Sequence, residues 1–513
     1  MRALPINHPE KAPAEKAAVI RKVKQPLDLS FHDYLWPLAF MLSATMIGLN
    51  FPLGYIFMLF ILINRWLNDR YDFIIQFTIF SGGYSLFLPY VDLFFPYDKC
   101  IFLLSVLLLF IYNKNKLEKK IFYLIVVYAV ILVCFARLSD ESMRIQFTGL
   151  VNWLSIVYFI IPMVCFGKED FDVKIFLKKI FPYFFIICCY YIIDGVILSS
   201  NFMIPRDSWA VSHGYMPKFY DYNIYPFAFY NLRLWPQPLY LSLFVIYAIS
   251  KYFKMNLWQW LLFFAALAIC RTFTLYISLL ICWVLCQGKV KQMLLFCVYA
   301  LLAFGILYLV DSEPEKQPND EYQSALRVRS SVKQFTDLFN AKDEEDLANF
   351  GSKRMAVVLP AMELLYDQHK EWVGLGFLDA AKTTKSKYIM TTDIGYDDDD
   401  PRREMVVTGI EIVPLQVILS IGYIGLLIHC VVYLLLWLLV RKLKYASLFG
   451  IITIGFVLLG LSGFSGLAAY QGLFLTGLSL AAVLLANKKE LDTRIKKVKP
   501  QIDTPKTRAN VRG

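Results

Sequence analysis

Long apolar runs recur along most of this chain and are separated by short charged stretches. The run from 257 to 286 has 30 residues, and Arg271 in its middle is its only charged residue. Charged residues make up 18% of the chain, whereas a soluble globular protein has about 25%. Such runs are long enough for membrane-crossing helices, and barrel strands would be shorter and would alternate. The sequence therefore predicts an all-α polytopic membrane protein.

The apolar segments predict a bundle of about 12–14 transmembrane helices. They lie near 34–49, 51–66, 72–90, 99–113, 120–137, 145–166, 181–199, 236–252, 257–270, 272–287, 291–311, 409–440, 446–461 and 465–486. This pattern divides the chain into a tail at 1–33, a transmembrane bundle at 34–311 with an outer loop at 200–235, one large outer helical loop at 312–408, transmembrane helices at 409–486, and a tail at 487–513.

Basic residues in the short loops predict the orientation. With the N-terminus in the cytoplasm, the short inner loops contain 17 Lys and Arg, and the short outer loops contain four. Both tails are then cytoplasmic, and both long loops lie outside. The 487–513 tail has nine basic residues against three acidic ones, which favours contact with anionic lipid. Because no basic domain is present, we expect the bilayer as a partner and no nucleic acid.

The 257–286 run poses the question of how a membrane protein accommodates Arg271. Lysines flank the run on both sides, at Lys251, Lys254, Lys289 and Lys291. Both ends are then cytoplasmic, so the run crosses twice, in halves of about 22 Å that are shorter than the ~30 Å hydrocarbon core. A charge in the centre of lipid costs about 2.5 kcal/mol or more. We therefore expect Arg271 at the outer turn of a hairpin, lining a depression open to the outside.

Cysteines and acidic residues give little indication of a metal site. All ten cysteines lie in or at the edge of apolar segments, so we expect free thiols, with no disulfide framework and no zinc site. The run from Asp397 to Asp400 precedes Arg402 and Arg403 and lacks the glycine spacing of a calcium loop. A solvated, locally neutralised strip is favoured, and a divalent-cation site is the alternative. No nucleotide-binding motif is present, and we expect no cofactor.

The two long outer stretches differ in character. Residues 312–405 are acidic, with 13 Lys and Arg against 19 Asp and Glu. Met355, Val358 and Leu365 recur at helical spacing, which predicts a helix on the membrane face that ends in a turn at Gly374-Leu375-Gly376. The shorter stretch is rich in aromatic residues. Its rings fit either an interfacial belt or a cleft in which rings stack on sugars.

Four stretches between 231 and 428 carry local motifs. NLRLWPQPLYLSLF has an arginine before a proline at a helix start, and LAICRTFTLYISLL is the apolar hairpin with arginine at its turn. KRMAVVLPAMELLYDQHKEWVGLGF has an arginine about twenty residues before Gly-x-Gly, and EIVPLQVILSIGYIGLL contains Gly422 and Gly425 in Gly-x-x-Gly. In this order they resemble the O-antigen polymerase and O-antigen ligase superfamily of bacterial polysaccharide assembly. Ligases carry a His-Asn pair where this chain has Glu411 and Ile412, so the resemblance favours a polymerase.

The resemblance implies a glycosyltransferase of the bacterial inner membrane that moves glycan from polyprenyl pyrophosphate to a sugar hydroxyl at the outer face. Arginines suit the pyrophosphate leaving group because they bind phosphate bidentately, and the attacking hydroxyl benefits from a general base. The implied catalytic residues are Glu411 as base, Arg271 and Arg354. The implied substrate-binding residues are Arg233, Arg327 and Arg329, although one of the last two could instead pair with loop acids. The implied partners are the polyprenyl-pyrophosphate-linked oligosaccharide and a chain-length regulator protein.

Three other functions compete with polymerisation. A ligase would transfer finished glycan to lipid A core or to protein. A transporter or lipid flippase without chemistry should show two related halves, and the sequence has no clear internal repeat. A purely structural membrane subunit would explain neither Arg271 nor the helix in the outer loop.

Overall fold

The computed structural model describes part of the chain. The described residues are 24–48, 53–87, 97–112, 114–138, 142–167, 171–193, 237–270, 275, 278–282, 298, 301–302, 304–316, 322–323, 328–330, 332–333, 336, 362, 365–377, 413–461 and 474–488.

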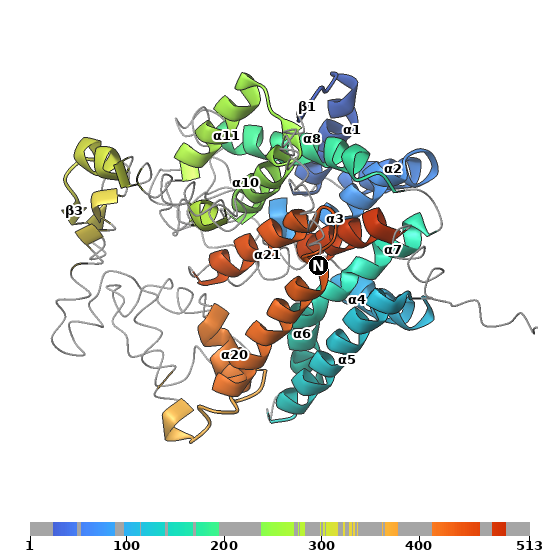
Figure 1. Ribbon diagram of the computed structural model, residues 1–513, viewed down its shortest axis with the longest axis vertical. Helices are drawn as coiled ribbons and strands as arrows, with labels where there is room; N and C mark the ends of the chain where they lie inside the picture. The colour runs from blue at the N-terminus through green and yellow to red at the C-terminus, as the bar shows by residue number, and fades with distance from the viewer. Residues whose placement is uncertain are drawn as a thin grey trace, which may run out of the picture.

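The described part is mostly helical (Figure 1). Its helices are α1 (His32–Gly48), α2 (Leu53–Asn68), α3 (Arg70–Phe87), α4 (Tyr97–Ile111), α5 (Lys116–Ala136), α6 (Met143–Leu154), η1 (Ser155–Phe159), α7 (Ile160–Phe166), α8 (Val173–Ile192), α10 (Gln237–Ser250), α11 (Leu257–Cys270), α20 (Val413–Val440), α21 (Ala446–Leu461) and a C-terminal helix, Phe474–Lys488. Short strands pair β1 (Gln25–Pro26) in parallel with β2 (Phe253–Lys254), and β3 (Glu315–Lys316) antiparallel with β4 (Tyr322–Gln323).

Two of the described helices are long and apolar enough to cross a membrane, Lys116–Ala136 and Val417–Val440. A third span results if Met143–Val151 and Ser155–Phe166, which are bent by 53° to each other, are counted as one. Six further apolar helices are shorter, with 10–17 residues. The described part is therefore mostly helical and has two or three helices that could span a membrane, which agrees with the helical membrane protein predicted from the apolar runs. The bundle of 12–14 transmembrane helices stays a prediction.

The segment predicted at 145–166 is not one continuous helix. Instead α6 gives way to the 3₁₀ turn η1, and α7 continues after it. Proline has no N–H, so Pro162 cannot donate to the carbonyl of Tyr158 one turn earlier. The hydroxyl of Ser155 takes part in the bend by donating to the carbonyl of Val151 at 2.5 Å. Tight 3₁₀ turns are common at such interruptions.

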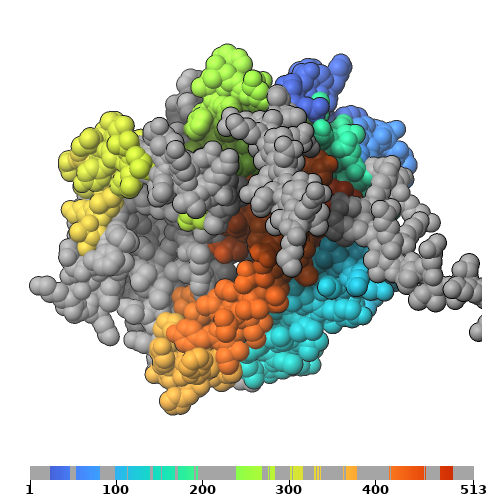
Figure 2. All heavy atoms as spheres, in the orientation of Figure 1, coloured from blue at the N-terminus to red at the C-terminus, as the bar shows by residue number. Residues whose placement is uncertain are grey.

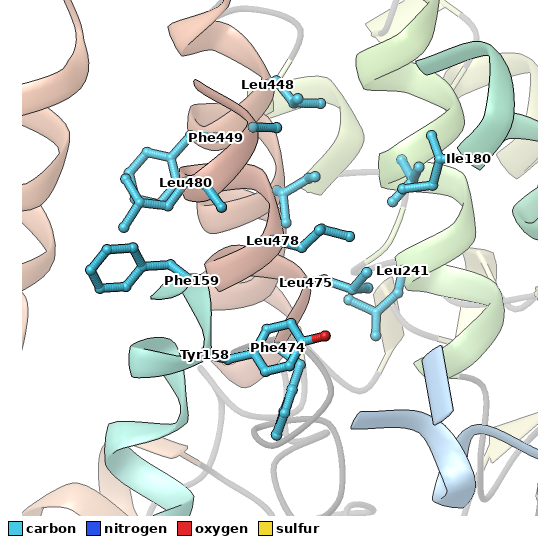
Figure 3. Close-up of a cluster of buried hydrophobic side chains, with 14 of the residues drawn as sticks. Tyr158, Phe159, Ile180, Leu241, Leu448, Phe449, Phe474, Leu475, Leu478 and Leu480 are labelled. Carbon is cyan, nitrogen blue, oxygen red and sulfur yellow. The ribbon is translucent and has the colours of Figure 1, made fainter. Parts of the chain in front are cut away.

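The C-terminal helix Phe474–Lys488 lies in the centre of the molecule. Its side chains from 474 to 485 are buried on all sides, as expected for a helix that is apolar around its whole circumference. Figure 3 shows Phe474, Leu475, Leu478 and Leu480 among side chains of η1, α8, α10 and α21. The labelled neighbours are Tyr158, Phe159, Ile180, Leu241, Leu448 and Phe449. This core holds the helices around which the other elements pack.

The turns that carry basic residues contact one another through side chains. These contacts join Lys24 to Ser250, Gln25 to Lys174, Arg70 to Cys165, Tyr71 to Asp172, Tyr252 to Ser447, Lys444 to Asn487, and Lys488 to both Tyr112 and Gly167. Lys24 donates to the Ser250 carbonyl at 2.6 Å, and burial lowers the pKa of this lysine. The basic turns therefore form one end of the molecule, which we call the basic end.

Helix α5 has a well-defined start near the basic end. The Asn115 side chain accepts hydrogen bonds from the N–H groups of Leu117 and Glu118 at 3.0 and 2.9 Å. The Glu118 carboxylate in turn accepts from the Asn115 N–H at 2.8 Å. Such a capping box stabilises a helix start by about 1 kcal/mol. It fixes where α5 begins, and α5 packs against α20 and α6.

Candidate functional site

Helix α20 is interrupted near its start. Gly422 has φ 67° and ψ −174°, which is not a helical conformation. This region of backbone space is open essentially to glycine alone. A break of this kind releases carbonyls from the turn before it and N–H groups from the turn after it. Inside or beside a bilayer these groups need partners, because each unsatisfied group costs several kcal/mol.

A segment of the loop before α20 supplies those partners. The N–H groups of Leu375 and Gly376 donate to the carbonyls of Leu419 and Ser420 at 2.7 and 2.9 Å. In the opposite direction, the N–H groups of Tyr423 and Ile424 donate to the carbonyls of Glu371 and Trp372 at 3.0 and 3.2 Å. We call these two segments, 371–376 and 419–424, the junction. Figures 1 and 2 show the loop segment in light orange beside the orange α20, at the lower edge of the molecule.

Gly374 and Gly422, one from each glycine motif noted in the sequence, lie in the junction and are required there. Gly374 has φ +76°, and a Cβ on it would lie 2.5 Å from main-chain atoms of Ser420 and Ile421. A Cβ on Gly422 would lie 2.2 Å from the carbonyl of Trp372. Main-chain atoms cannot rotate away as a side chain can. Gly374 and Gly422 therefore lie on the two sides of one close main-chain contact.

The loop helix ends earlier than the sequence predicted. A turn at Gly374-Leu375-Gly376 was expected to end it, but its helical residues stop at Asp367. The His369 N–H donates to the Tyr366 carbonyl at 3.0 Å, and the Lys370 N–H to the Leu365 carbonyl at 2.9 Å. With φ 52° at His369, this is a Schellman motif. It leaves the following residues free to pair with α20.

Phe377 fastens the end of the loop segment to the helices beneath it. Its ring is 4% exposed and lies 5.9 Å from the ring of Trp153. A Cβ on Gly149 would meet the Phe377 ring at 2.4 Å, so α6 is close-packed against it. Trp153 also contacts the ring of His429, whose Nδ1 lies 2.6 Å from the Tyr128 hydroxyl. The loop side of the junction therefore packs against α6 through Phe377 and Trp153, and Trp153 in turn contacts α20 and, through His429, α5.

Three aromatic rings and one carboxylate gather at the junction. The hydroxyls of Tyr366 and Tyr423 are 3.4 Å apart, and the rings of Trp372 and Tyr423 meet edge to face at 5.8 Å. Trp372 is 61% exposed and Tyr366 52%. The Oε2 atom of Glu371 is buried and has no hydrogen-bond partner among the residues that the structure describes. We call these four residues the aromatic platform.

Arg329 is the one predicted site residue within the described part of the chain. Its Nε donates to the Tyr308 carbonyl at 2.8 Å, its Nη1 pairs with Glu313, and its guanidinium lies 5.1 Å from the centre of the Tyr308 ring. Its own N–H donates to Asp311 at 2.9 Å. These contacts pair the side chain with a loop acid, the alternative that the sequence left open. Its role in binding substrate stays a prediction.

The other predicted site residues fall outside the described residues. They are Arg233, Arg271, Arg327, Arg354 and Glu411, and the same holds for the 200–235 loop and for the acidic run at 397–400. Seven cysteines in the described part are free thiols. Within that part, no group of three or more His, Cys, Asp or Glu could hold a metal ion.

A second cluster of charged side chains joins α2, α3 and α8. Lys179 Nζ lies 2.9 Å from Asp69 and 3.3 Å from Asp72. Arg65 lies 3.8 Å from Asp72 and stacks over the ring of Trp36 at 3.7 Å. Each of these charges has an opposite charge beside it. We interpret the cluster as a structural clamp near the basic end rather than as a binding site.

The aromatic platform was not predicted from the sequence. Its residues are ordinary for the end of an amphipathic loop helix, where Tyr and Trp usually anchor the membrane interface. The sequence did place Glu371 and Trp372 close to the Gly-x-Gly motif, separated from it by Val373 alone. The contact between Tyr128 and His429 gave no signal, because a lone histidine in an apolar run is most often a packed core residue.

Fold and site together define a mostly helical protein, with helices long and apolar enough to span a membrane, in which a loop segment completes an interrupted helix. No protein-family model, no curated protein and no solved structure matches the chain.

Proposed function

We propose that this protein polymerises lipid-linked polysaccharide repeat units of the O-antigen or capsule type. It transfers glycan from polyprenyl pyrophosphate to a sugar hydroxyl at the outer face of the bacterial inner membrane. The junction is the observation that supports this most. Gly374, Gly376 and Gly422, which carry the resemblance to the polymerase and ligase superfamily, make one main-chain contact between the loop and α20.

The proposed topology has 12–14 transmembrane helices, with both tails in the cytoplasm and the 312–408 loop outside. Helix α20 supports this orientation. After the break it runs without interruption from Tyr423 to Val440, about 27 Å at 1.5 Å per residue, which is close to the hydrocarbon thickness. Beyond Val440 the chain reaches Lys444, which contacts Asn487 at the basic end. The junction and the basic end therefore lie at opposite ends of one span.

The proposed chemistry needs fixed cations and a base on the junction side. Arg271 and Arg354 stabilise the charge that develops on the pyrophosphate, the type of contribution that is usually the largest in catalysis, while Arg233, Arg327 and Arg329 bind substrate. The acceptor oxygen bonds to the anomeric carbon as the bond from that carbon to the pyrophosphate oxygen breaks. Glu411 takes the proton of the hydroxyl. In the sequence it stands two residues before the start of α20.

A transporter is the second candidate, and the break in α20 is the observation that favours it. Discontinuous helices in transporters use the released main-chain groups to bind ions and substrate. In this chain four such groups, on Leu419, Ser420, Tyr423 and Ile424, already pair with the loop. They are satisfied by the protein itself, which favours a role in holding the loop in place over a role in coordinating a transported ion.

Deletion of the gene tests the function, with the surface polysaccharide sized by gel electrophoresis. Loss of a polymerase leaves single repeat units attached to the surface acceptor. Loss of a ligase accumulates long lipid-linked chains, and loss of a flippase traps single repeats in the cytoplasm. An unchanged distribution of chain lengths in the deletion strain would contradict the proposal.

Reporter fusions test the orientation separately. A fusion near Asp346 should report a periplasmic position, and a fusion at Lys444 should report a cytoplasmic one. The opposite pair of results would place the junction on the cytoplasmic side, away from a substrate presented at the outer leaflet, and the transferase proposal would be wrong whatever the polysaccharide phenotype.

A further inference from the structure

We propose that the aromatic platform, formed by Tyr366, Glu371, Trp372 and Tyr423, binds a sugar ring of the acceptor glycan. This inference rests on the proposed function and adds to it the place where the acceptor is held. It assigns the residues that recognise carbohydrate to the junction itself, separate from the arginines proposed for the pyrophosphate.

The rings present the surface that a sugar needs. A pyranose has one face of C–H groups, and the negative face of an aromatic ring attracts such groups. Trp372 and Tyr366 are both more than half exposed. Trp372 meets Tyr423 edge to face at 5.8 Å with an interplanar angle of 67°. The ring of Tyr423 thus restrains the indole of Trp372, and much of the indole surface stays open to a ligand.

Glu371 supplies the polar partner. A buried carboxylate oxygen without a donor is costly, and a hydrogen bond to a charged group is worth about 1.5–3 kcal/mol, roughly 10- to 100-fold in binding. The Oε2 atom of Glu371 has no donor among the described residues. Sugar hydroxyls are neutral donors, often two on adjacent carbons, and a carboxylate accepts from both. A few polar groups among aromatic rings are the usual composition of a small-ligand site.

The junction holds these side chains in place before any ligand arrives. The carbonyls of Glu371 and Trp372 accept from the N–H groups of Tyr423 and Ile424, so the main chain on both sides of the platform is fixed. Tyr366 is tied to Tyr423 through their hydroxyls at 3.4 Å. A preorganised site loses less entropy on binding than one built on a free loop. An interfacial belt needs no such fixation, because its rings only have to reach the headgroups.

The experiment measures glycan transfer by the full-length protein in lipid nanodiscs. The donor is the polyprenyl-pyrophosphate-linked repeat unit of the source organism, and the acceptor is a soluble fluorescent glycoside of the same repeat unit. Trp372→Ala should raise the acceptor KM about 10-fold and Glu371→Gln about 5- to 10-fold, since the amide loses the charge of the acceptor oxygen. Neither should change the donor KM by more than about 2-fold. Trp372→Phe keeps a ring and should stay within about 3-fold of wild type.

Two control variants separate a sugar site from a membrane anchor. Trp258→Ala removes another exposed tryptophan, 76% exposed at the start of α11. Asp367→Asn removes an exposed carboxylate from the loop helix. Both should leave the acceptor KM unchanged. An acceptor KM that is unchanged in Trp372→Ala and Glu371→Gln, or raised equally in Trp258→Ala, would overturn the inference.

Binding of the glycoside, measured by equilibrium dialysis, separates this inference from the proposed function. If wild type binds the glycoside with a dependence on Trp372 but transfers nothing, the transferase proposal is wrong and the subsite stands. If wild type transfers glycan and neither variant weakens binding of the glycoside, the subsite is wrong and the transferase proposal stands. Absence of both binding and transfer in wild type refutes the two together.

Discussion

Replacing Gly422 by alanine should separate the loop from α20. The new Cβ would lie 2.2 Å from the carbonyl carbon and oxygen of Trp372 and 2.4 Å from the N–H nitrogen of Val373. These are main-chain atoms, so no rotamer change can relieve the contact. Either α20 straightens at the break or the loop segment moves away, and in both cases the junction opens.

The magnitude follows from two contributions. A non-glycine residue at φ 67° and ψ −174° is disfavoured by about 1–3 kcal/mol. The new Cβ also overpacks the closed junction against main-chain atoms of Trp372 and Val373, which typically costs about 1–3 kcal/mol. Together they destabilise the closed junction by about 2–6 kcal/mol. At 1.4 kcal/mol per factor of ten, the open junction gains about 30-fold to 10⁴-fold in population.

Hydrogen exchange measured by mass spectrometry on the protein in nanodiscs reports this opening directly. Peptides covering 365–377 and 419–424 should exchange at least about 30-fold faster in Gly422→Ala, while peptides from α5 should keep the wild-type rate. Gly305→Ala is the matched control, since a Cβ there meets nothing within 4 Å. Equal protection of both junction peptides in Gly422→Ala and wild type would refute the reasoning.

Three further predictions concern packing, charge and chemistry. Gly149→Ala should displace Phe377, because the new Cβ would lie 2.4 Å from its ring. Overpacking should lower the free energy of unfolding by about 1–3 kcal/mol, and an unchanged melting temperature would argue against the contact. Lys179→Met should destabilise the folded protein by about 3 kcal/mol, because it leaves the carboxylate of Asp72, 4% exposed, without its nearest cation. Adding Asp72→Asn should restore much of the lost melting temperature, and no restoration would contradict the structural clamp. Arg271→Lys should insert normally yet lose most polymer, because lysine cannot bind phosphate bidentately; normal chain lengths at equal protein amount would end its catalytic role.

The positions of several described helices could be predicted closely from the sequence, but their interruptions could not. The segment expected near 51–66 is α2, Leu53–Asn68, and the one expected near 446–461 is α21, Ala446–Leu461. Apolar runs locate helices because burial in lipid depends on the residues of the run alone. A break depends on a partner for the released main-chain groups. For Gly422 that partner lies about fifty residues earlier in the chain.

The candidate site was predicted in part. The sequence indicated that Gly374, Gly376 and Gly422 belong to motifs, but not that the two motifs lie in contact. It left open whether Arg329 pairs with a loop acid, and the structure provides that partner in Glu313. Glu371 was not considered at all, since nothing in a linear sequence distinguishes a carboxylate with a buried, unpartnered oxygen from one in solvent.

The sequence predicts a helical membrane protein, the positions of several of its helices and the clustering of basic residues in its short turns. These follow from local composition, because the free energy of moving a segment out of water is close to a sum over its own residues. The tertiary structure alone decided that the loop closes the break in α20 and that Tyr366, Glu371, Trp372 and Tyr423 meet there. Such contacts join segments that are far apart in the chain. Because main-chain groups make the hydrogen bonds, the identity of the side chains gives almost no indication of them. Only the glycines, forced by the close approach of two backbones, left a trace of the junction in the sequence.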